Sequence, residues 1–271
     1  MYRKIFTCLF LFASLNIAQS LTVINTEKLI PGEQERLYFP RFSPDGNYIT
    51  MSKSNFKGLW LYNLSQKELI KINDNFGSGF EPFFTDDSTI HFQIDEYINK
   101  RRIQIPKVYN TINGLETNDT SKLSLNISVK SGSSSIVISE KDKTRNLKPM
   151  GEGAYVWVSL SPDKDKILFT LLGKGTFVCD LEGRIISELG YANAPSWSPK
   201  GNWITYMVDK DDGISYISSD IFISSLNGKT KFNLTNTKDD IEMYPDWSPD
   251  GKKIVYNNLS GDIIISEFEI K

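Results

Sequence analysis

Five segments of the chain carry the same short alternation of residues. Each has an isoleucine, a variable middle residue and a large apolar third residue, which is the period-two pattern of a half-buried β-strand. In every case the isoleucine follows an aromatic residue or leucine by six or seven positions. The five segments are residues 49–51, 90–92, 167–169, 204–206 and 254–256. We therefore predict one equivalent strand in each of five repeated units.

Further apolar stretches follow these strands at similar distances. Four of them superimpose without gaps and predict a third strand of the unit, and three later stretches predict a fourth, outer strand. The third strands are expected at 59–64, 176–181, 221–226 and 263–268, and the outer strands at 68–73, 184–189 and 230–235. The unit is thus a sheet of four antiparallel strands.

A turn with a defined chemistry precedes each of the 49–51-type strands. It is written Ser-Pro-Asp-Gly in its best copies, where Pro presets φ at the second position and Gly releases the chain at the fourth. The residue just before the turn marks each unit and can pack between sheets. These markers are Phe42, Phe84, Leu160, Trp197 and Trp247, with spacings of 42, 76, 37 and 50 residues. The spacing of 76 covers two units, of which the second retains strands expected at 123–129, 135–139 and 144–147.

A unit of about 40 residues that repeats strand and turn in this way is typical of a β-propeller. We predict an all-β fold, a propeller of six four-stranded blades, in one domain over residues 21–271. Five or seven blades remain alternatives because residues 98–123 are hard to assign, and Pro106 indicates an edge or interrupted strand there. The last unit lacks an outer strand, whereas residues 21–30 supply a spare one. Pairing the two would close the ring.

These residues resemble a known family. The Pro-x-aromatic-Ser-Pro-Asp-Gly segments, followed by Ile-x-aromatic and by Asp-Ile-Phe at 220–222 or Asp-Ile-Ile at 262–264, are similar to the TolB-like β-propeller repeat. That repeat builds the propeller of periplasmic TolB and those of dipeptidyl-peptidase-type enzymes. The resemblance implies the fold. We expect no counterpart of TolB's amino-terminal domain or of the peptidases' hydrolase domain, so neither partner binding nor a nucleophile is carried over to individual residues.

The first twenty residues differ from the rest. Arg3 and Lys4 precede an apolar stretch at 5–15, and Ala18-Gln19-Ser20 supplies small residues before a cleavage site. This predicts a secretory signal peptide over residues 1–20. The alternative, a retained anchor, is disfavoured because the stretch is shorter than the roughly 20 residues that span a bilayer. We expect an exported protein, periplasmic or extracellular, with no transmembrane segment after cleavage.

Charge argues against one class of partner, and cysteine content argues against an internal disulfide. The chain has 39% hydrophobic and 24% charged residues, as expected of a soluble globular protein. Without the signal peptide it carries 29 basic and 33 acidic residues, a net charge of −4, which argues against nucleic-acid binding. The basic run at 100–102 is expected to decorate a hairpin. Cleavage would remove Cys8 and leave Cys179 alone, so no internal disulfide is expected.

Residues with reactive side chains are few. His91 is the only histidine, takes a packing position in its strand, and is accompanied by no Gly-x-Ser-x-Gly elbow. Cys179 falls in a third strand and is interpreted as a small structural residue. The run Asp209-Lys210-Asp211-Asp212-Gly213 resembles a calcium loop, but its Gly comes one position early and no closing Glu follows. We expect a polar hairpin tip there, and no cofactor or metal.

The inner strands should line the centre of the ring. Their side chains expected at the channel mouth are Arg41, Glu81, Trp157, Ser196 and Asp246. One cation, two acids and an aromatic ring suit recognition of a ligand or peptide.

The sequence favours an exported, monomeric, non-enzymatic propeller that binds or scaffolds a protein, peptide or glycan partner in the cell envelope. The alternative is a carboxylate-based glycan hydrolase or lyase, which would need two facing acids over a deep channel.

Overall fold

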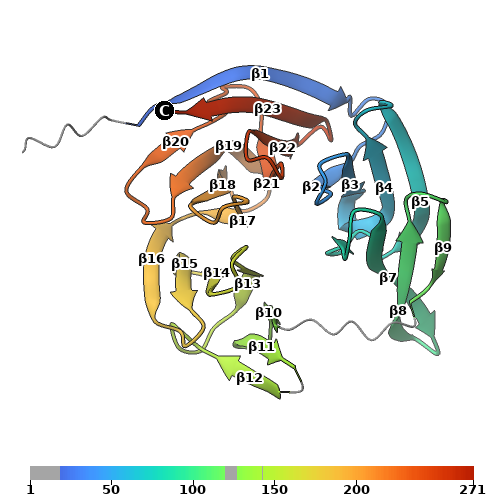
Figure 1. The fold of residues 1–271 in the computed structure, drawn as a ribbon, viewed down its shortest axis with the longest axis horizontal. Coiled ribbons are helices and arrows are strands. Elements are labelled where there is room, and N and C mark those ends of the chain that lie inside the picture. Colours follow the sequence, from blue (N-terminus) through green and yellow to red (C-terminus); the bar gives the residue numbers. More distant parts are fainter. Residues whose placement is uncertain (1–18, 120–126, 142) are drawn as a thin grey trace, which may run out of the picture.

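Six sheets stand around a common centre like the blades of a propeller (Figure 1). The computed structural model describes residues 19–119, 127–141 and 143–271. The predicted signal peptide, including Cys8, lies outside the described residues except for its last two positions. Within the described part of the chain, no helix is long and apolar enough to cross a membrane. The all-β, six-bladed prediction is confirmed.

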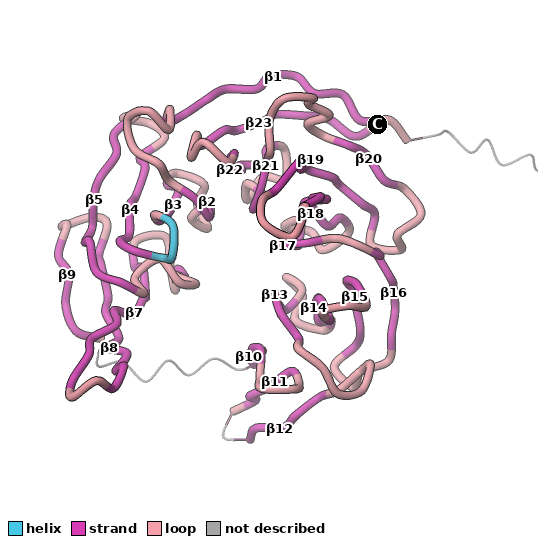
Figure 2. The backbone as a smooth tube through the Cα atoms, turned by 180° about the vertical axis from the view of Figure 1, so that it is seen from behind, coloured by secondary structure: helices cyan, strands magenta, loops and turns pink. Residues whose placement is uncertain are grey.

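The first two blades follow one another directly along the chain, and each has four antiparallel strands numbered from the centre outward. Seen from behind, a 3-10 turn, η1 (Ser54–Phe56), connects the second and third strands of the first blade (Figure 2). Blade 1 consists of β2 (Tyr38–Phe42), β3 (Tyr48–Ser52), β4 (Lys57–Asn63) and β5 (Glu68–Phe76). Blade 2 consists of β6 (Phe83–Phe84), β7 (Thr89–Ile98), β8 (Arg101–Asn110) and β9 (Leu115–Asn118).

The remaining blades complete the ring. Blade 3 consists of β10 (Ile127–Ser131), β11 (Ile136–Glu140) and β12 (Lys143–Leu147). Blade 4 consists of β13 (Tyr155–Leu160), β14 (Lys166–Leu171), β15 (Gly175–Asp180) and β16 (Ile185–Gly190). Blade 5 consists of β17 (Asn193–Trp197), β18 (Trp203–Asp211), β19 (Tyr216–Ser225) and β20 (Lys231–Asn233). Blade 6 consists of β21 (Glu242–Trp247), β22 (Lys253–Asn258), β23 (Ile263–Ile270) and β1 (Leu21–Ile30).

Blade 6 closes the ring as predicted, because its outer strand comes from the other end of the described chain. β1 pairs antiparallel with β23, from Leu21 opposite Ile270 to Ile30 opposite Ile263. Backbone hydrogen bonds of 2.9 Å continue the pairing between Ser20 and Lys271. The closing sheet therefore has no free edge at β23.

The region that the sequence left open, residues 98–123, contains a long hairpin. β7 and β8 pair over their whole length, and their turn residues Asn99 and Lys100 have φ of 50° and 65°, as in a type I′ turn. Pro106 lies within β8 where the outer strand β9 ends, and its carbonyl accepts the Asp119 N–H. Proline has no N–H to donate, and because β9 ends at Asn118, no bond of the β8–β9 pairing is lost at this position. Of the three strands expected for blade 3, all are present, although residues 123–126 of the first lie outside the described residues.

The serine that begins each Ser-Pro turn has a role that was not predicted from the sequence. In four blades its hydroxyl accepts the N–H of the residue five positions later, at 2.9–3.0 Å, while its own N–H bonds that residue's carbonyl. These serines are Ser43, Ser161, Ser198 and Ser248. The Gly of the turn has φ near +70°, and Lys164, which replaces it in blade 4, is held at φ 61°.

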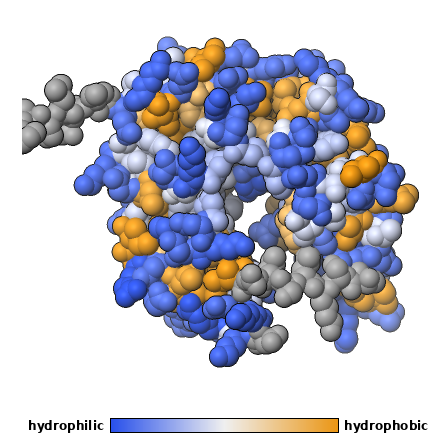
Figure 3. Space-filling model, in the orientation of Figure 1, coloured by the Kyte–Doolittle hydropathy of each residue, from blue (hydrophilic) through white to orange (hydrophobic). Residues whose placement is uncertain are grey.

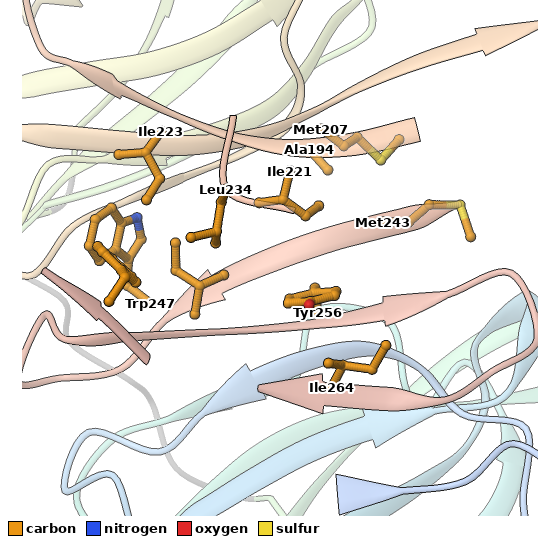
Figure 4. Close-up of a cluster of buried hydrophobic side chains, with 11 residues drawn as sticks. Ala194, Met207, Ile221, Ile223, Leu234, Met243, Trp247, Tyr256 and Ile264 are labelled. Carbon is orange, nitrogen blue, oxygen red and sulfur yellow. The ribbon is translucent and has the colours of Figure 1, made fainter. Parts of the chain in front are cut away.

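Hydrophobic side chains are buried mainly between neighbouring blades, in five clusters. The cluster between blades 5 and 6 packs Ile221 and Ile223 of β19 against Trp247, Ile254 and Tyr256 (Figure 4). The other four clusters join blades 6 and 1, 1 and 2, 3 and 4, and 4 and 5. None of the five clusters of described residues joins blades 2 and 3.

Candidate functional site

Three of the five predicted channel residues meet at one carboxylate. Asp246 of β21 accepts hydrogen bonds from Arg41 of β2 at 3.0 Å and from Ser196 of β17 at 2.8 Å. Its second oxygen accepts the Phe42 N–H at 3.0 Å. The Asp246 side chain is 15% exposed and that of Arg41 47%. Asp246 therefore ties the inner strands of three blades together, whereas the Arg41 guanidinium remains half open to solvent.

The other two predicted residues do not join this network. Glu81 precedes β6 and is exposed, and Trp157 is half-buried and packs against the cluster between blades 5 and 6. Both lie three positions before their marker residues, whereas Arg41, Ser196 and Asp246 lie one position before theirs. The five predicted residues thus come from two positions of the repeat, and only the residues one position before the marker meet at Asp246.

The position three before the marker has its own geometry. In four blades a β-bulge interrupts the pairing of the inner strand at this point. The residue there is left-handed, with φ between 45° and 60° in blades 1, 2, 4, 5 and 6, and none of the five is glycine: Phe39, Glu81, Trp157, Ala194 and Tyr244. At such a bulge the backbone N–H lies outside the strand pairing and needs another acceptor. The Phe39 N–H donates to Asn257 Oδ1 at 3.0 Å.

Two of these bulge residues begin a row of aromatic rings, which we call the aromatic band (Tyr244, Phe39, Phe56, Phe80). Ring centroids lie 4.5 Å apart between Tyr244 and Phe39, 4.6 Å between Phe39 and Phe56, and 5.1 Å between Phe56 and Phe80. The row thus runs from blade 6 across blade 1 to the connection into blade 2. Tyr244, Phe39 and Phe56 are half-buried, and Phe80 is 40% exposed.

Backbone strain accompanies the band. Phe39, Phe56 and Tyr244 have φ of 60°, 53° and 55°, which costs a bulky residue roughly 1–2 kcal/mol each. Such conformations persist where the surrounding structure holds them and cluster at functional sites. The band was missed from the sequence because its members come from four separate segments. Its available signal was the aromatic residue three positions before the marker in blades 1, 4 and 6.

Polar groups surround the Tyr244 end of the band. Burial, with Tyr216 and Asp209 nearby, raises the pKa of Tyr244 to about 12, so the phenol stays neutral. Asp209 is buried and accepts hydrogen bonds from Tyr191 Oη at 3.0 Å and Asn193 Nδ2 at 2.8 Å. The loop that follows Asp209 is the predicted hairpin tip, in which the carboxylates of Asp211 and Asp212 accept the loop's own N–H groups.

The remaining reactive side chains are held in the interior. His91 is 5% exposed, stacks on Phe83, and lies 2.7 Å from Asp119 Oδ2 and 3.1 Å from Thr85 Oγ1. Burial raises the pKa of Cys179 to about 12, which keeps it a thiol. Among the residues that the structure describes, no group of three or more His, Cys, Asp or Glu side chains is placed to hold a metal.

One acid was missed from the sequence. Glu242, at the start of β21, is 2% exposed, and its carboxylate accepts a hydrogen bond from Thr237 at 2.7 Å. Burial, opposed by that hydrogen bond, raises the pKa of Glu242 to about 7. Nothing in its sequence context signalled this, because burial depends on the packing of blade 6.

The opening near the centre of the ring is bordered mainly by hydrophilic and intermediate residues on the face shown in Figure 3. The polar contacts of Arg41, Ser196 and Asp246 agree with this character. The candidate site therefore combines a polar centre with the adjoining aromatic band.

Comparisons with known proteins agree on the fold. No family model matches the chain. Dipeptidyl-peptidase 5 of Porphyromonas gingivalis is 36% identical over 70 residues, which are 25% of this chain and 10% of that protein. The chain therefore matches only a tenth of this relative's length, and the match does not transfer its activity.

Solved structures resemble most of the chain. TolB from Acinetobacter baumannii has 18% sequence identity and a TM-score of 0.56, covering 78% of this chain and 57% of TolB. An oligogalacturonate lyase from Vibrio parahaemolyticus has 11% identity and a TM-score of 0.52, covering 92% and 98%. The Cps50 (Swd1) propeller domain of Myceliophteria thermophila has 9% identity and a TM-score of 0.57, covering 92% and 99%. The chain thus has a TolB-like propeller fold, which it shares with these structures.

Proposed function

We propose that this protein is an exported, non-enzymatic binding propeller whose partner is a protein or peptide that docks across the aromatic band. The observation that carries the proposal is the row of partly exposed rings from Tyr244 to Phe80, three of which belong to residues with strained backbone. Aromatic side chains that are partly exposed on a rigid scaffold are the residues that most often anchor protein partners. The half-exposed Arg41 beside the channel adds a charged contact.

The state of the acids favours binding over catalysis. A glycan hydrolase needs two carboxyl groups that face a substrate. Asp246 is occupied by Arg41, Ser196 and the Phe42 N–H, and Glu242 is 2% exposed. Neither of these two groups is presented to a ligand, so that among the predicted channel residues Glu81 is the one exposed acid and has no partner acid among them. The resemblance in fold to TolB is compatible with binding, and the resemblance to the lyase keeps the enzymatic alternative as an outcome of the test.

The proposal is tested by selecting random peptides on the immobilised protein and by probing a glycan array in parallel. We expect a peptide consensus whose affinity falls about tenfold or more in Phe80→Ala, as for an interface anchor, and less in Arg41→Glu. Leu172→Ala is the matched control, because Leu172 is 57% exposed on blade 4, away from the band. Glycan binding without peptide binding, or equal loss in the control, would contradict the proposal. Asp246 is unsuitable for charge reversal because its loss would also loosen three blades.

Export is a separate part of the proposal. β1 begins at Leu21, directly after the predicted cleavage site, so cleavage would leave β1 intact and would remove only the backbone hydrogen bonds between Ser20 and Lys271. Amino-terminal sequencing of the protein from its native source should begin at Leu21. A chain that begins at Met1, or one that stays in the cytoplasmic fraction, would refute this part alone.

A further inference from the structure

A pocket of about 330 Å³ lies where the aromatic band reaches blade 2. Its walls come from the loop at η1, from the β5–β6 connection and from the β7–β8 hairpin, so it is a cleft between two blades. The lining side chains include four aromatic rings and one ion pair: Phe56, Phe76, Phe80, Tyr97, Asp95 and Arg102. This volume is at the low end for ligand sites and suits a single ring-sized group.

One polar atom of the pocket has no partner among the described residues. The Asp95 side chain is 9% exposed, and its Oδ2 lies 2.8 Å from the Arg102 guanidinium. Its Oδ1 is buried and makes no hydrogen bond. Leaving such an acceptor unpaired costs free energy that a ligand donor would recover. The Asp95 carboxylate therefore lines the pocket with hydrogen-bonding capacity that the described residues leave unused.

The backbone at Gly77 lies close against the Asp95 carboxylate. Gly77 has φ of 81°, and a Cβ there would sit 2.7 Å from Asp95 Cγ and 2.9 Å from Oδ1. Any larger residue would displace the acid or fill the space beside it. The ring of Phe80 meets that of Phe56 edge to face, at an interplanar angle of 82°. Glycine and the two rings thus shape the cleft around Asp95.

The chemistry of the lining selects the occupant. Asp95 and Arg102 neutralise each other, so neither an anion nor a cation is favoured. An aromatic wall with a carboxylate acceptor, which Asn55 joins in the lining, fits a neutral ring that carries an O–H or N–H at its edge, as the side chains of tyrosine and tryptophan do. We propose that this pocket receives a tyrosine or tryptophan anchor of the partner, whose O–H or N–H donates to the Asp95 carboxylate. The inference rests on the proposed function, because it assumes a protein or peptide partner.

Small probes test the pocket without the partner. Binding of 4-ethylphenol and of 4-ethylanisole to the purified protein is measured by ligand-observed NMR, because only the phenol can donate. We expect the phenol to bind about tenfold more tightly, as for a hydrogen bond to a charged acceptor. In Asp95→Leu the preference should vanish while the anisole still binds. Gly77→Ala should weaken both probes, and Leu172→Ala neither.

Asp95→Asn is the second variant at this position, should Asp95→Leu fail to fold. It should reduce the preference for the phenol over the anisole to about two- or threefold. Equal affinity of the two probes for the native protein, no binding of either, or binding of methyl β-glucoside in their place would overturn the inference. These results are independent of the peptide selection. A peptide consensus lost in Phe80→Ala but without tyrosine or tryptophan would leave the proposed function standing and refute the anchor.

Discussion

The junction between blades 6 and 1 differs from that between blades 2 and 3. At the first, β1 extends the last sheet, Ile49 and Leu37 are fully buried, and side chains of blade 6 bond the backbone of blade 1. At the second, none of the five hydrophobic clusters of described residues crosses between the blades, and the connecting residues 120–126 are not described. The two ends of the described chain thus pair within blade 6, and β1 then leads directly into blade 1, where packing and polar contacts join the two blades.

The largest expected difference between the junctions is in hydrophobic packing. Ile49→Ala should lower the free energy of unfolding by about 2–5 kcal/mol, because it leaves a cavity in a fully buried cluster. Ile98→Ala removes the same atoms from a blade 2 side chain that is 51% exposed and should cost less than about 0.5 kcal/mol. Urea denaturation of both variants measures the contrast. Similar losses would contradict the claim that the buried cluster at the closing junction stabilises the fold.

The polar contacts at closure should have the next largest effect. Asp262 of blade 6 accepts the Gly32 N–H at 2.6 Å, the Asn258 amide at 2.9 Å and Lys28 Nζ at 2.7 Å. Asp262→Ala strands these donors and should lower the free energy of unfolding by about 2–3 kcal/mol. Asp239→Ala, for which no hydrogen bond or ion pair is described, is the control. An equal loss in both variants would contradict this role.

Acid should weaken the same contacts. Burial opposes ionisation of Asp262, but its hydrogen bonds from Gly32 and Lys28 prevail and lower its pKa below the ordinary 3.8. A lowered folded pKa gives stability that is present above the unfolded value and is lost as pH falls through the folded one. The penalty of Asp262→Ala should therefore shrink below about pH 4. Denaturation curves at pH 3 and pH 6 measure it, and a constant penalty would be inconsistent with this linkage.

Glu242, at the neighbouring junction of blades 5 and 6, should behave in the opposite way. Its folded pKa of about 7 lies above the ordinary 4.5, so the native state holds a proton that the unfolded state releases. Stability should fall by on the order of 2 kcal/mol as pH rises from 5 to 8, and Glu242→Gln should remove this slope. Urea denaturation at several pH values tests it. An unchanged slope in the variant would assign the dependence to other groups.

The smallest change in the free energy of unfolding is expected at a turn of blade 4, remote from both junctions. Lys164 has φ of 61° where the equivalent residues of three other blades are glycine. Lys164→Gly should raise the free energy of unfolding by about 0.5–1 kcal/mol, since it relieves strain at some cost in backbone entropy. The reciprocal Gly201→Lys should lower it by a similar amount. Thermal denaturation resolves both, and a loss in Lys164→Gly would indicate that the lysine side chain contributes contacts.

Strands, turns and closure could be predicted because each depends on local patterns that recur. The Ser-Pro-Asp-Gly turn and the Ile-x-aromatic strand mark five units, and the spare strand at 21–30 has a defined vacancy to fill. The site was predicted only in part. Arg41, Ser196 and Asp246 share one position of the repeat, whereas Phe56, Asp95 and Glu242 acquire their roles from neighbours distant in the sequence. The left-handed residues carried no glycine signal, because packing and side-chain contacts hold them.

Ring closure by β1 underlies both the fold and the binding face, and a cross-link tests it most directly. Thr26 lies opposite Ser266 in the strand pairing, and their hydroxyl oxygens are 3.0 Å apart. Thr26→Cys with Ser266→Cys, in a Cys8→Ser chain whose Cys179 is buried, has the spacing that a disulfide requires. With the ring closed in this way, we expect a rapid bond within one chain and a raised thermal midpoint. Free thiols after oxidation, or a bond between two chains, would contradict it.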